Sequence, residues 1–155
     1  MASSGQPLDI GILLAAAYQE FVFELRAALA AQGFDDTGRS DGYVLRALAA
    51  GPTTVSALAE RLDITKQGAG QLVEAMEQRG YLERHPDPHD RRARLVGLSA
   101  RGQEVLRAAR RFHQRYERQL VREHGPDRVA AFRALLTAIV GPDAVEDPRL
   151  RALYL

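Results

Sequence analysis

Several polar residues lie on one side of a helix that the sequence predicts between Thr65 and Arg79. Apolar residues recur in this stretch at the spacing that buries one helix face: Ala69, Leu72, Val73 and Met76. The opposite face then carries Gln67 and Gln71, with Lys66 near its N-terminal end. Glutamine can form a bidentate hydrogen bond with adenine, lysine can reach guanine or a phosphate, and Thr65 with the free amides of the first turn can bind a phosphate oxygen. This side therefore has the chemistry to read a DNA sequence, although a helix with an ordinary polar outer face has the same pattern.

The same predicted helix contains two glycines, Gly68 and Gly70. Each costs about 1 kcal/mol relative to alanine inside a helix. A close approach of the backbone to DNA or to the neighbouring helix would explain this cost.

Charged residues also gather at a predicted turn between two short strands: Asp90, Arg91, Arg92 and Arg94. An arginine at such a turn can enter a DNA minor groove, where the negative potential is strongest over narrow A·T-rich segments. Asp90 can hold the guanidinium of Arg92 in place through a bidentate pair. A solvated salt bridge within the loop is the alternative for this group.

The residue patterns that catalysis or metal binding would need are missing from the sequence. There is no G-x-S-x-G motif, no glycine-rich phosphate loop and no close group of carboxylates on a recognised scaffold. The absence of cysteine excludes disulfides, thiolate nucleophiles and zinc fingers. The four histidines include no His-x-x-x-His pair on a predicted helix. We therefore expect no enzyme activity, no metal and no cofactor.

Composition indicates one ordinary globular domain over residues 1–155. The formal net charge is only +1, so it is the local distribution that matters. Arginines are concentrated in the stretch 101–123, for which a solvated helix face is the ordinary explanation. No apolar stretch is long enough to cross a membrane, and the N-terminus does not resemble a secretory leader, so we expect a cytoplasmic protein without membrane contact.

The elements that position the polar residues are mostly helices. Helical periodicity and end signals predict helices over 8–31, 40–50, 54–62, 65–79, 99–123 and 127–140, and strands over 81–85 and 93–98. Ser40, Thr54, Thr65 and Ser99 are the predicted N-caps. Only Asp63 and Ile64 join the two central helices, which is typical of a helix-turn-helix. The predicted fold is mostly α with a small β wing, in which a winged helix-turn-helix over 39–98 is flanked by helices over 8–31 and 100–140.

The flanking helices carry more apolar residues than one core stripe needs. The first helix has Ile12, Leu13, Val22 and Phe23 outside its main stripe, and the long helix has Phe112, Tyr116 and Leu120. Such a surplus is typical of an obligate dimer interface, although core helices can look similar. We therefore expect a homodimer built from 8–31 and 100–140.

The run LAERLDITKQGAGQLVEAMEQRGYLERHPDPHDRRARLVGLSARG resembles the MarR (multiple antibiotic resistance regulator) family. Its most specific part is the wing, with GYLER, then DPHDRR, then an apolar strand that ends in Leu98-Ser99 and is followed by Gly102. The flanking helices agree in number and order, so the resemblance covers roughly 10–140. Gly68 stands where this family commonly has a bulkier residue, and the absence of cysteine excludes the thiol-sensing mode of some members.

The resemblance implies roles for particular residues. In the Asp-x-Arg motif of the wing, Asp90 would orient Arg92 as it enters the minor groove, and the dimer would bind a palindromic operator. A small aromatic or phenolic ligand would bind in a cleft between the dimer region and the DNA-binding lobe, for which the candidate lining residues are Tyr18, Phe21, Tyr43 and His113.

We therefore expect a homodimeric transcriptional regulator, a repressor, that binds double-stranded DNA. DNA and ligand would favour different separations of the two recognition helices, which couples their affinities reciprocally. A winged-helix module that binds proteins and has lost DNA binding is the alternative. The arginines at the predicted turn argue against it.

Overall fold

A computed structural model describes residues 8–90 and 93–141 of the chain. It confirms the predicted class, because the described residues form helices and one two-stranded antiparallel sheet. The chain divides into two compact units, Met1–Asp35 and Asp36–Leu155, and each is described by itself. Arg91, Arg92 and the tail 143–155 lie outside the described residues.

The described part of the first unit, residues 8–35, contains the helix α1 (Ile10–Ala30). Three residues after its last residue the chain turns at Gly33, which has a φ of 84° that other residues rarely adopt. The N–H of Phe34 then donates to the carbonyl of Leu29 over 3.1 Å, which satisfies one of the last carbonyls of the helix.

The second unit begins with three helices, α2 (Asp41–Ala47), α3 (Val55–Leu62) and α4 (Lys66–Gln78). Thr54 and Thr65 cap α3 and α4 as predicted, each hydroxyl accepting a hydrogen bond from a first-turn amide at 3.1 and 3.0 Å. Asp63 turns the chain between α3 and α4 with a φ of 51°, which aspartate tolerates better than most residues. The tight connection predicted for a helix-turn-helix is therefore present.

The prediction for α2 was right about the N-cap position, Ser40, but wrong about the capping hydrogen bond and about the C-terminal end. The helix ends at Ala47 rather than Ala50, and the Ser40 side chain forms no capping hydrogen bond. Instead the carboxylate of Asp41 accepts a hydrogen bond of 2.7 Å from the N–H of Gly38. A buried carboxylate thus organises the start of α2, where the sequence suggested an exposed hydroxyl.

The wing consists of β1 (Leu82–Pro86) and β2 (Arg94–Leu98). Leu82 pairs with Leu98 at the base of this hairpin, and Pro86 pairs with Arg94 near its tip. Val96 also exchanges two backbone hydrogen bonds, of 2.8 and 3.0 Å, with Thr53. The hairpin is therefore attached through its backbone to the segment that precedes α3.

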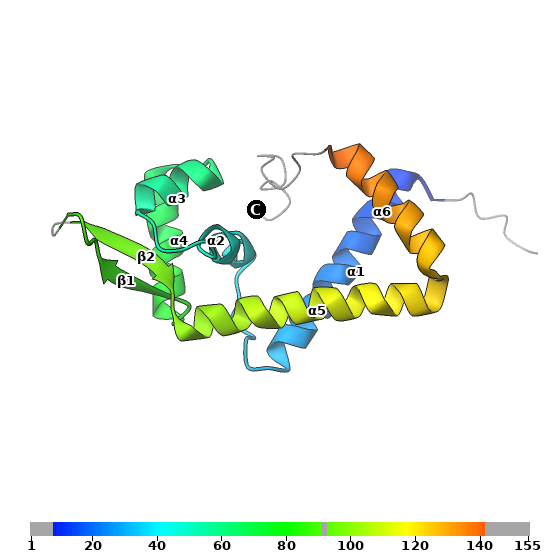
Figure 1. The fold of residues 1–155 in the computed structure, drawn as a ribbon, viewed down its shortest axis with the longest axis horizontal. Helices are drawn as coiled ribbons and strands as arrows, with labels where there is room; N and C mark the ends of the chain where they lie inside the picture. The colour runs from blue at the N-terminus through cyan, green and yellow to red at the C-terminus, as the bar shows by residue number, and fades with distance from the viewer. Residues whose placement is uncertain (1–7, 91–92, 142–155) are drawn as a thin grey trace, which may run out of the picture. The chain divides into compact units, whose positions relative to one another are not determined.

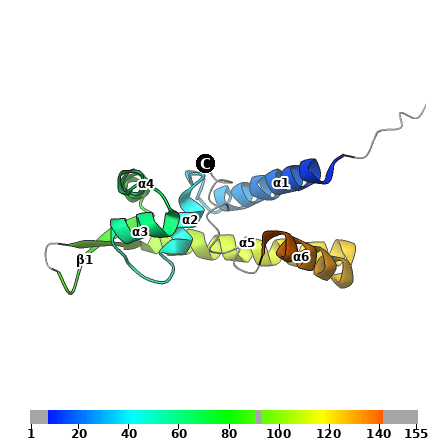
Figure 2. The ribbon, with the colours of Figure 1, turned by 90° about the horizontal axis from the view of Figure 1, so that it is seen from above.

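Two helices complete the second unit, α5 (Ala100–His124) and α6 (Pro126–Val140). Ser99 caps α5 as predicted, because its hydroxyl accepts a 3.0 Å hydrogen bond from the N–H of Gly102. The helix-turn-helix and the hairpin lie at the N-terminal end of α5, and α6 packs at its C-terminal end (Figures 1 and 2). The single helix α5 thus connects the helix-turn-helix and the hairpin with α6.

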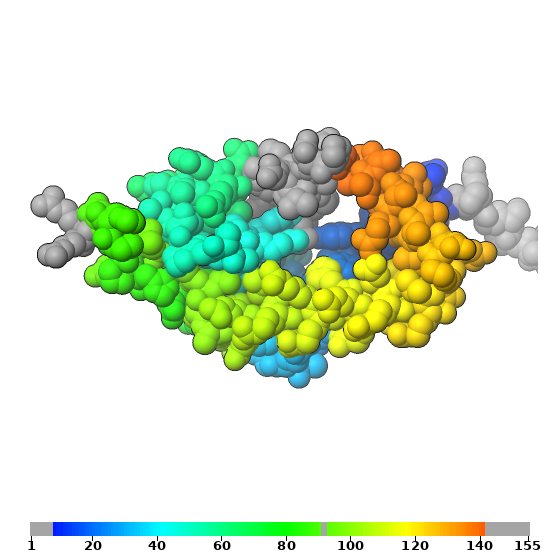
Figure 3. Space-filling model, in the orientation of Figure 1, coloured from blue at the N-terminus to red at the C-terminus, as the bar shows by residue number. Residues whose placement is uncertain are grey.

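The core of the second unit lies between α2, α3, α4, the hairpin and the first half of α5 (Figure 1). Its fully buried side chains are Val44, Leu48, Leu58, Val73, Met76, Tyr81, Val96 and Val105. Phe112 is also buried within the chain, so the prediction that it adds to a surplus outer surface was wrong. By contrast, no residue of α6 is buried, and its side chains form the surface at that end of α5 (Figure 3).

Candidate nucleic-acid interface

The two faces of α4 are arranged as the sequence predicts. Ala69, Val73 and Met76 are 0% exposed and face the core. Lys66, Gln67 and Gln71 are exposed. Because the core side is fully packed, α4 is held rigidly while its other side presents amide and ammonium groups to solvent.

Thr65 occupies the N-cap of α4, and its side chain is exposed. Its hydroxyl oxygen accepts a 3.0 Å hydrogen bond from the N–H of Gly68, so that amide is no longer available to a phosphate. The hydroxyl hydrogen and the earlier amides of the first turn are the remaining donors there. These donors lie at the positive end of the helix dipole, which favours an anion.

The two glycines of α4 differ in their surroundings. A Cβ at Gly68 would lie 3.2 Å from the Thr65 Oγ1, whereas a Cβ at Gly70 would meet no atom within 4 Å. A close approach to the neighbouring helix therefore does not explain Gly70. Of the two explanations considered for Gly70, a close approach of the backbone to DNA therefore stays a hypothesis.

The structure describes part of the predicted wing contact. Asp90 and Arg94 are exposed, and Arg94 begins β2. The tip is closed by backbone hydrogen bonds, from Ala93 N–H to Asp90 O at 3.0 Å and from Asp87 N–H to Ala93 O at 3.3 Å. Arg91 and Arg92 lie outside the described residues, so the pairing of Asp90 with Arg92 stays a prediction.

Two of the four residues predicted to line a ligand cleft lie on packed helices of the second unit. Tyr43 is on α2, where the Arg46 guanidinium carbon lies 5.3 Å from the centre of its ring. His113 is on α5, and its pKa is lowered by burial and by the positive charge of Arg46. Tyr18 and Phe21 are half-buried on α1 in the first unit, and their part in the cleft stays a prediction.

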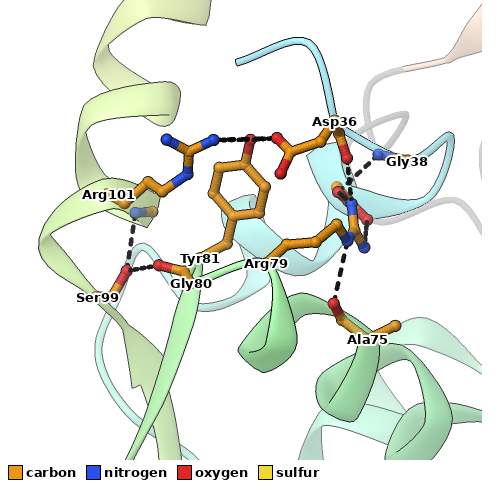
Figure 4. A network of polar contacts seen from close by, with 10 residues as sticks. Asp36, Gly38, Ala75, Arg79, Gly80, Tyr81, Ser99 and Arg101 are labelled. Carbon is orange, nitrogen blue, oxygen red and sulfur yellow. Dashed lines mark hydrogen bonds and ion pairs between the residues drawn. The ribbon is translucent and has the colours of Figure 1, made fainter. Parts of the chain in front are cut away.

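The structure also shows a polar network that the sequence did not predict (Figure 4). Asp41 is the one charged residue among the buried side chains of the described residues. Its carboxylate accepts two hydrogen bonds from Arg79, from Nη1 at 2.6 Å and from Nη2 at 3.2 Å. This bidentate ion pair attaches the start of α2 to the C-terminal end of α4.

Asp36 forms the second half of the network. Its carboxylate accepts hydrogen bonds from the Tyr81 hydroxyl and, at 3.1 Å, from Arg101. Its backbone carbonyl accepts a 2.7 Å hydrogen bond from Nη1 of Arg79. The ring of Tyr81 lies between the two arginines, with guanidinium carbons 5.8 Å (Arg79) and 4.9 Å (Arg101) from its centre.

The ionisation of this group follows from its contacts. Burial, together with the hydrogen bond to Asp36, raises the pKa of Tyr81 to about 12. The hydrogen bonds from Tyr81 and Arg101 lower the pKa of Asp36. At neutral pH the network therefore contains a neutral phenol between carboxylates and guanidinium groups.

Close backbone contacts fix the base of the wing on α5. The Ser99 hydroxyl donates to the Gly80 carbonyl at 2.6 Å, and the Ser99 N–H donates to the Tyr81 carbonyl at 3.1 Å. A Cβ at Gly102 would lie 2.1 Å from the Tyr81 carbonyl oxygen, so only glycine fits there without rearrangement. The sequence did contain a signal for this contact, because Gly102 belongs to the run that carries the family resemblance.

Residues 8–90 and 93–141 contain no group of three or more histidines, aspartates or glutamates placed to hold a metal ion. In the same part of the chain no helix combines the length and the apolar character that crossing a bilayer requires.

Comparison with known proteins identifies the central part of the chain. The sequence model of the MarR family matches residues 35–93. The transcriptional regulator HosA of Escherichia coli O111:H- is 40% identical over 67 residues, which are 43% of this chain and 50% of that protein. The match thus spans about half the length of this relative.

Solved structures share the fold over most of the chain. RV1404 from Mycobacterium tuberculosis is 22% identical with a TM-score of 0.73, covering 90% of this chain and 97% of its own. FabT of Streptococcus pneumoniae, solved in complex with DNA, is 21% identical with a TM-score of 0.70, covering 84% and 92%. The segment 35–93 is thus similar to the MarR family, and the chain shares the fold of these solved structures.

Proposed function

We propose that this protein is a DNA-binding transcriptional regulator rather than an enzyme. The observation that carries the proposal is the exposed face of α4, where Lys66, Gln67 and Gln71 stand opposite a fully buried face. Amide and ammonium groups at the N-terminal part of such a helix suit base edges in a major groove. Similarity to HosA and to the DNA-bound FabT supports the same function.

We propose further that the regulator is a homodimer. On α1, Ile10 is 75% exposed and Phe23 is 68% exposed, and on α6 Leu135 and Ile139 are 59% and 60% exposed. Large apolar side chains at this exposure are typical of surfaces that bury each other in an assembly. A second copy of the chain is the expected partner, with an interface of at least ~2,000 Å² in total. A folded monomer at micromolar concentration in sedimentation would contradict this.

In such a homodimer, each subunit would contribute one reading head, the unit formed by α2, α3, α4 and the hairpin. Two identical reading heads would bind a palindromic operator. The wing would add Arg92 in the minor groove beside each half-site, with Asp90 orienting it and Arg91 or Arg94 meeting phosphates. We propose repression as the regulatory outcome, released by a small aromatic or phenolic ligand near Tyr43 and His113, with Tyr18 and Phe21 contributing.

The experiment that tests DNA binding uses duplexes selected from a random library and measures affinity against salt concentration. Wild-type protein should bind selected duplexes more tightly than random ones, with affinity falling as salt rises. Arg92→Ala should weaken binding and flatten the salt dependence by about one unit of slope without unfolding the protein. Absence of any DNA binding would instead favour a winged-helix module that binds proteins.

Asp90→Ala is the more informative wing variant. Removing a negative charge should strengthen binding to DNA if only net charge matters. If Asp90 orients Arg92, the same change should weaken binding. Tighter binding by Asp90→Ala would refute the orienting role.

A further inference from the structure

Asp36 contacts the C-terminal end of α4, the start of the wing and the first turn of α5. Its carbonyl accepts a hydrogen bond from Arg79, the C-cap residue that follows α4, and its carboxylate accepts one from Tyr81, which precedes β1. The same carboxylate accepts from Arg101 in the first turn of α5. One residue therefore joins the recognition helix, the wing and the long helix (Figure 4).

We propose that Asp36 is a positioning residue that fixes the angle between α4 and α5, and thereby the separation at which a dimer reads its two half-sites. The proposal rests on the proposed function as a dimeric DNA-binding regulator. It adds a residue outside the DNA-reading surface that determines which operator spacing is accepted.

The chemistry of the contact explains why Asp36 carries this role. Tyr81 is fully buried, and its hydroxyl would lose its acceptor without the Asp36 carboxylate. The guanidinium groups of Arg79 and Arg101 lie near the same ring and repel each other, and the carboxylate offsets that repulsion. Without Asp36, Arg101 would lose the anion that holds it against Tyr81, and α5 would lose a polar attachment to the reading head.

The ion pair of Asp41 with Arg79 should keep α2 and α4 together when the Asp36 carboxylate is removed. It joins α2 to α4 through two hydrogen bonds and does not include α5. Removing the Asp36 carboxylate leaves this pair and the apolar core in place. The reading head should therefore stay folded while its angle to α5 becomes less strictly defined.

A small change in angle has a large effect because α5 is long. Its 25 residues extend for about 37 Å at 1.5 Å per residue. A tilt of about 5° at one end moves the other end by about 3 Å, which is close to the rise of one DNA base pair. The spacing accepted by the dimer should therefore respond to the contact at Asp36.

The test compares operators whose half-sites are separated by the selected spacing, by one base pair more and by one base pair less. Wild type should prefer its own spacing by about 10-fold or more, because docking of two half-sites is geometrically strict. Asp36→Ala and Asp36→Asn should reduce that preference to less than about 3-fold, with affinity for an isolated half-site within about 2-fold of wild type. Asp35→Asn, at the exposed neighbouring position, is the matched control and should retain the wild-type preference.

The measured spacing preferences of the Asp36 variants decide whether Asp36 has this positioning role. Equal losses at all three spacings, or an unchanged preference, would overturn it. If Asp36→Ala does not fold, Tyr81→Phe removes only the hydroxyl that the carboxylate binds, and it should also broaden the spacing preference. Wild-type protein that binds no duplex would refute the proposed function itself, which is a different result from wild type and Asp36 variants binding with the same preference.

Discussion

Arg79, at the C-terminal end of the recognition helix, donates two hydrogen bonds of 2.6 and 3.2 Å to the carboxylate of Asp41 at the start of α2. The Asp41 side chain is only 4% exposed, so this carboxylate has exchanged its hydration for the guanidinium and the N–H of Gly38. The position of α4 relative to α2 therefore depends on one buried ion pair as well as on apolar packing.

Asp41→Ala should lower the free energy of unfolding by about 3 kcal/mol, because it leaves Arg79 without its carboxylate partner in a partly buried site. Urea unfolding measures this change. Asp127→Ala, at an exposed aspartate in the first turn of α6, is the control and should cost less than about 1 kcal/mol. Equal effects of the two substitutions would show that the buried pair contributes little.

Two glycine substitutions should change stability in opposite directions. Gly70→Ala should raise the free energy of unfolding by about 1 kcal/mol, since the added Cβ meets nothing and alanine is the better helix former. Gly102→Ala should lower it, since its Cβ would lie 2.1 Å from the Tyr81 carbonyl oxygen.

Gly70→Ala also tests why the recognition helix α4 contains a glycine at a position where the fold would accept alanine. If the backbone approaches DNA at Gly70, Gly70→Ala should weaken operator binding even though the protein is more stable. A variant that is both more stable and binds as tightly as wild type would rule out that close approach.

Alkaline titration should detect the raised pKa of Tyr81. Its pKa of about 12 in the folded protein lies above the ordinary value of 10.0, so the folded state holds this proton more tightly than the unfolded state. The corresponding stability is complete below pH 10 and is lost as the pH rises toward 12. Tyrosinate absorbance should therefore show a step near pH 12 that is missing in Tyr81→Phe, and identical titrations of the two proteins would contradict the network.

His113 should respond in the opposite pH range. Its pKa is lowered from 6.5 by burial and by Arg46, so the folded state favours the neutral imidazole. The corresponding stability is present above pH 6.5 and is lost as the pH falls through the lower pKa of the folded state. A phenolic acid bound beside His113 should raise this pKa, and an NMR titration of the His113 imidazole with and without the acid would detect the change. An unchanged value at saturating ligand would place the ligand elsewhere.

The parts of the fold that depend on neighbours in sequence could be predicted. Thr54, Thr65 and Ser99 cap their helices because each hydroxyl needs only an amide three residues ahead. The alternation of buried and exposed residues along α4 is likewise local. These signals were sufficient to define the helix-turn-helix and the side of α4 that faces solvent.

The polar network could not be predicted in the same way. Asp36 and Tyr81 are 45 residues apart, and Asp41 and Arg79 are 38 apart. In the sequence, Asp36 and Asp41 look like ordinary polar residues of a loop and a helix start. Only the packing of α2 against α3 and α5 shows that one of them is buried, and only the folded chain brings both to an arginine.

The most direct test of sequence reading by α4 compares Gln67→Ala and Gln71→Ala on the selected operator and on random duplex DNA. If the outer face of α4 reads base sequence, each substitution should cost ~1–3 kcal/mol on the operator and much less on random DNA. Gln78→Ala, at an exposed glutamine near the other end of α4, is the matched control and should change neither affinity. Equal losses on operator and random DNA would show that these glutamines touch only the backbone, and would contradict the assignment of α4 as the element that reads the sequence.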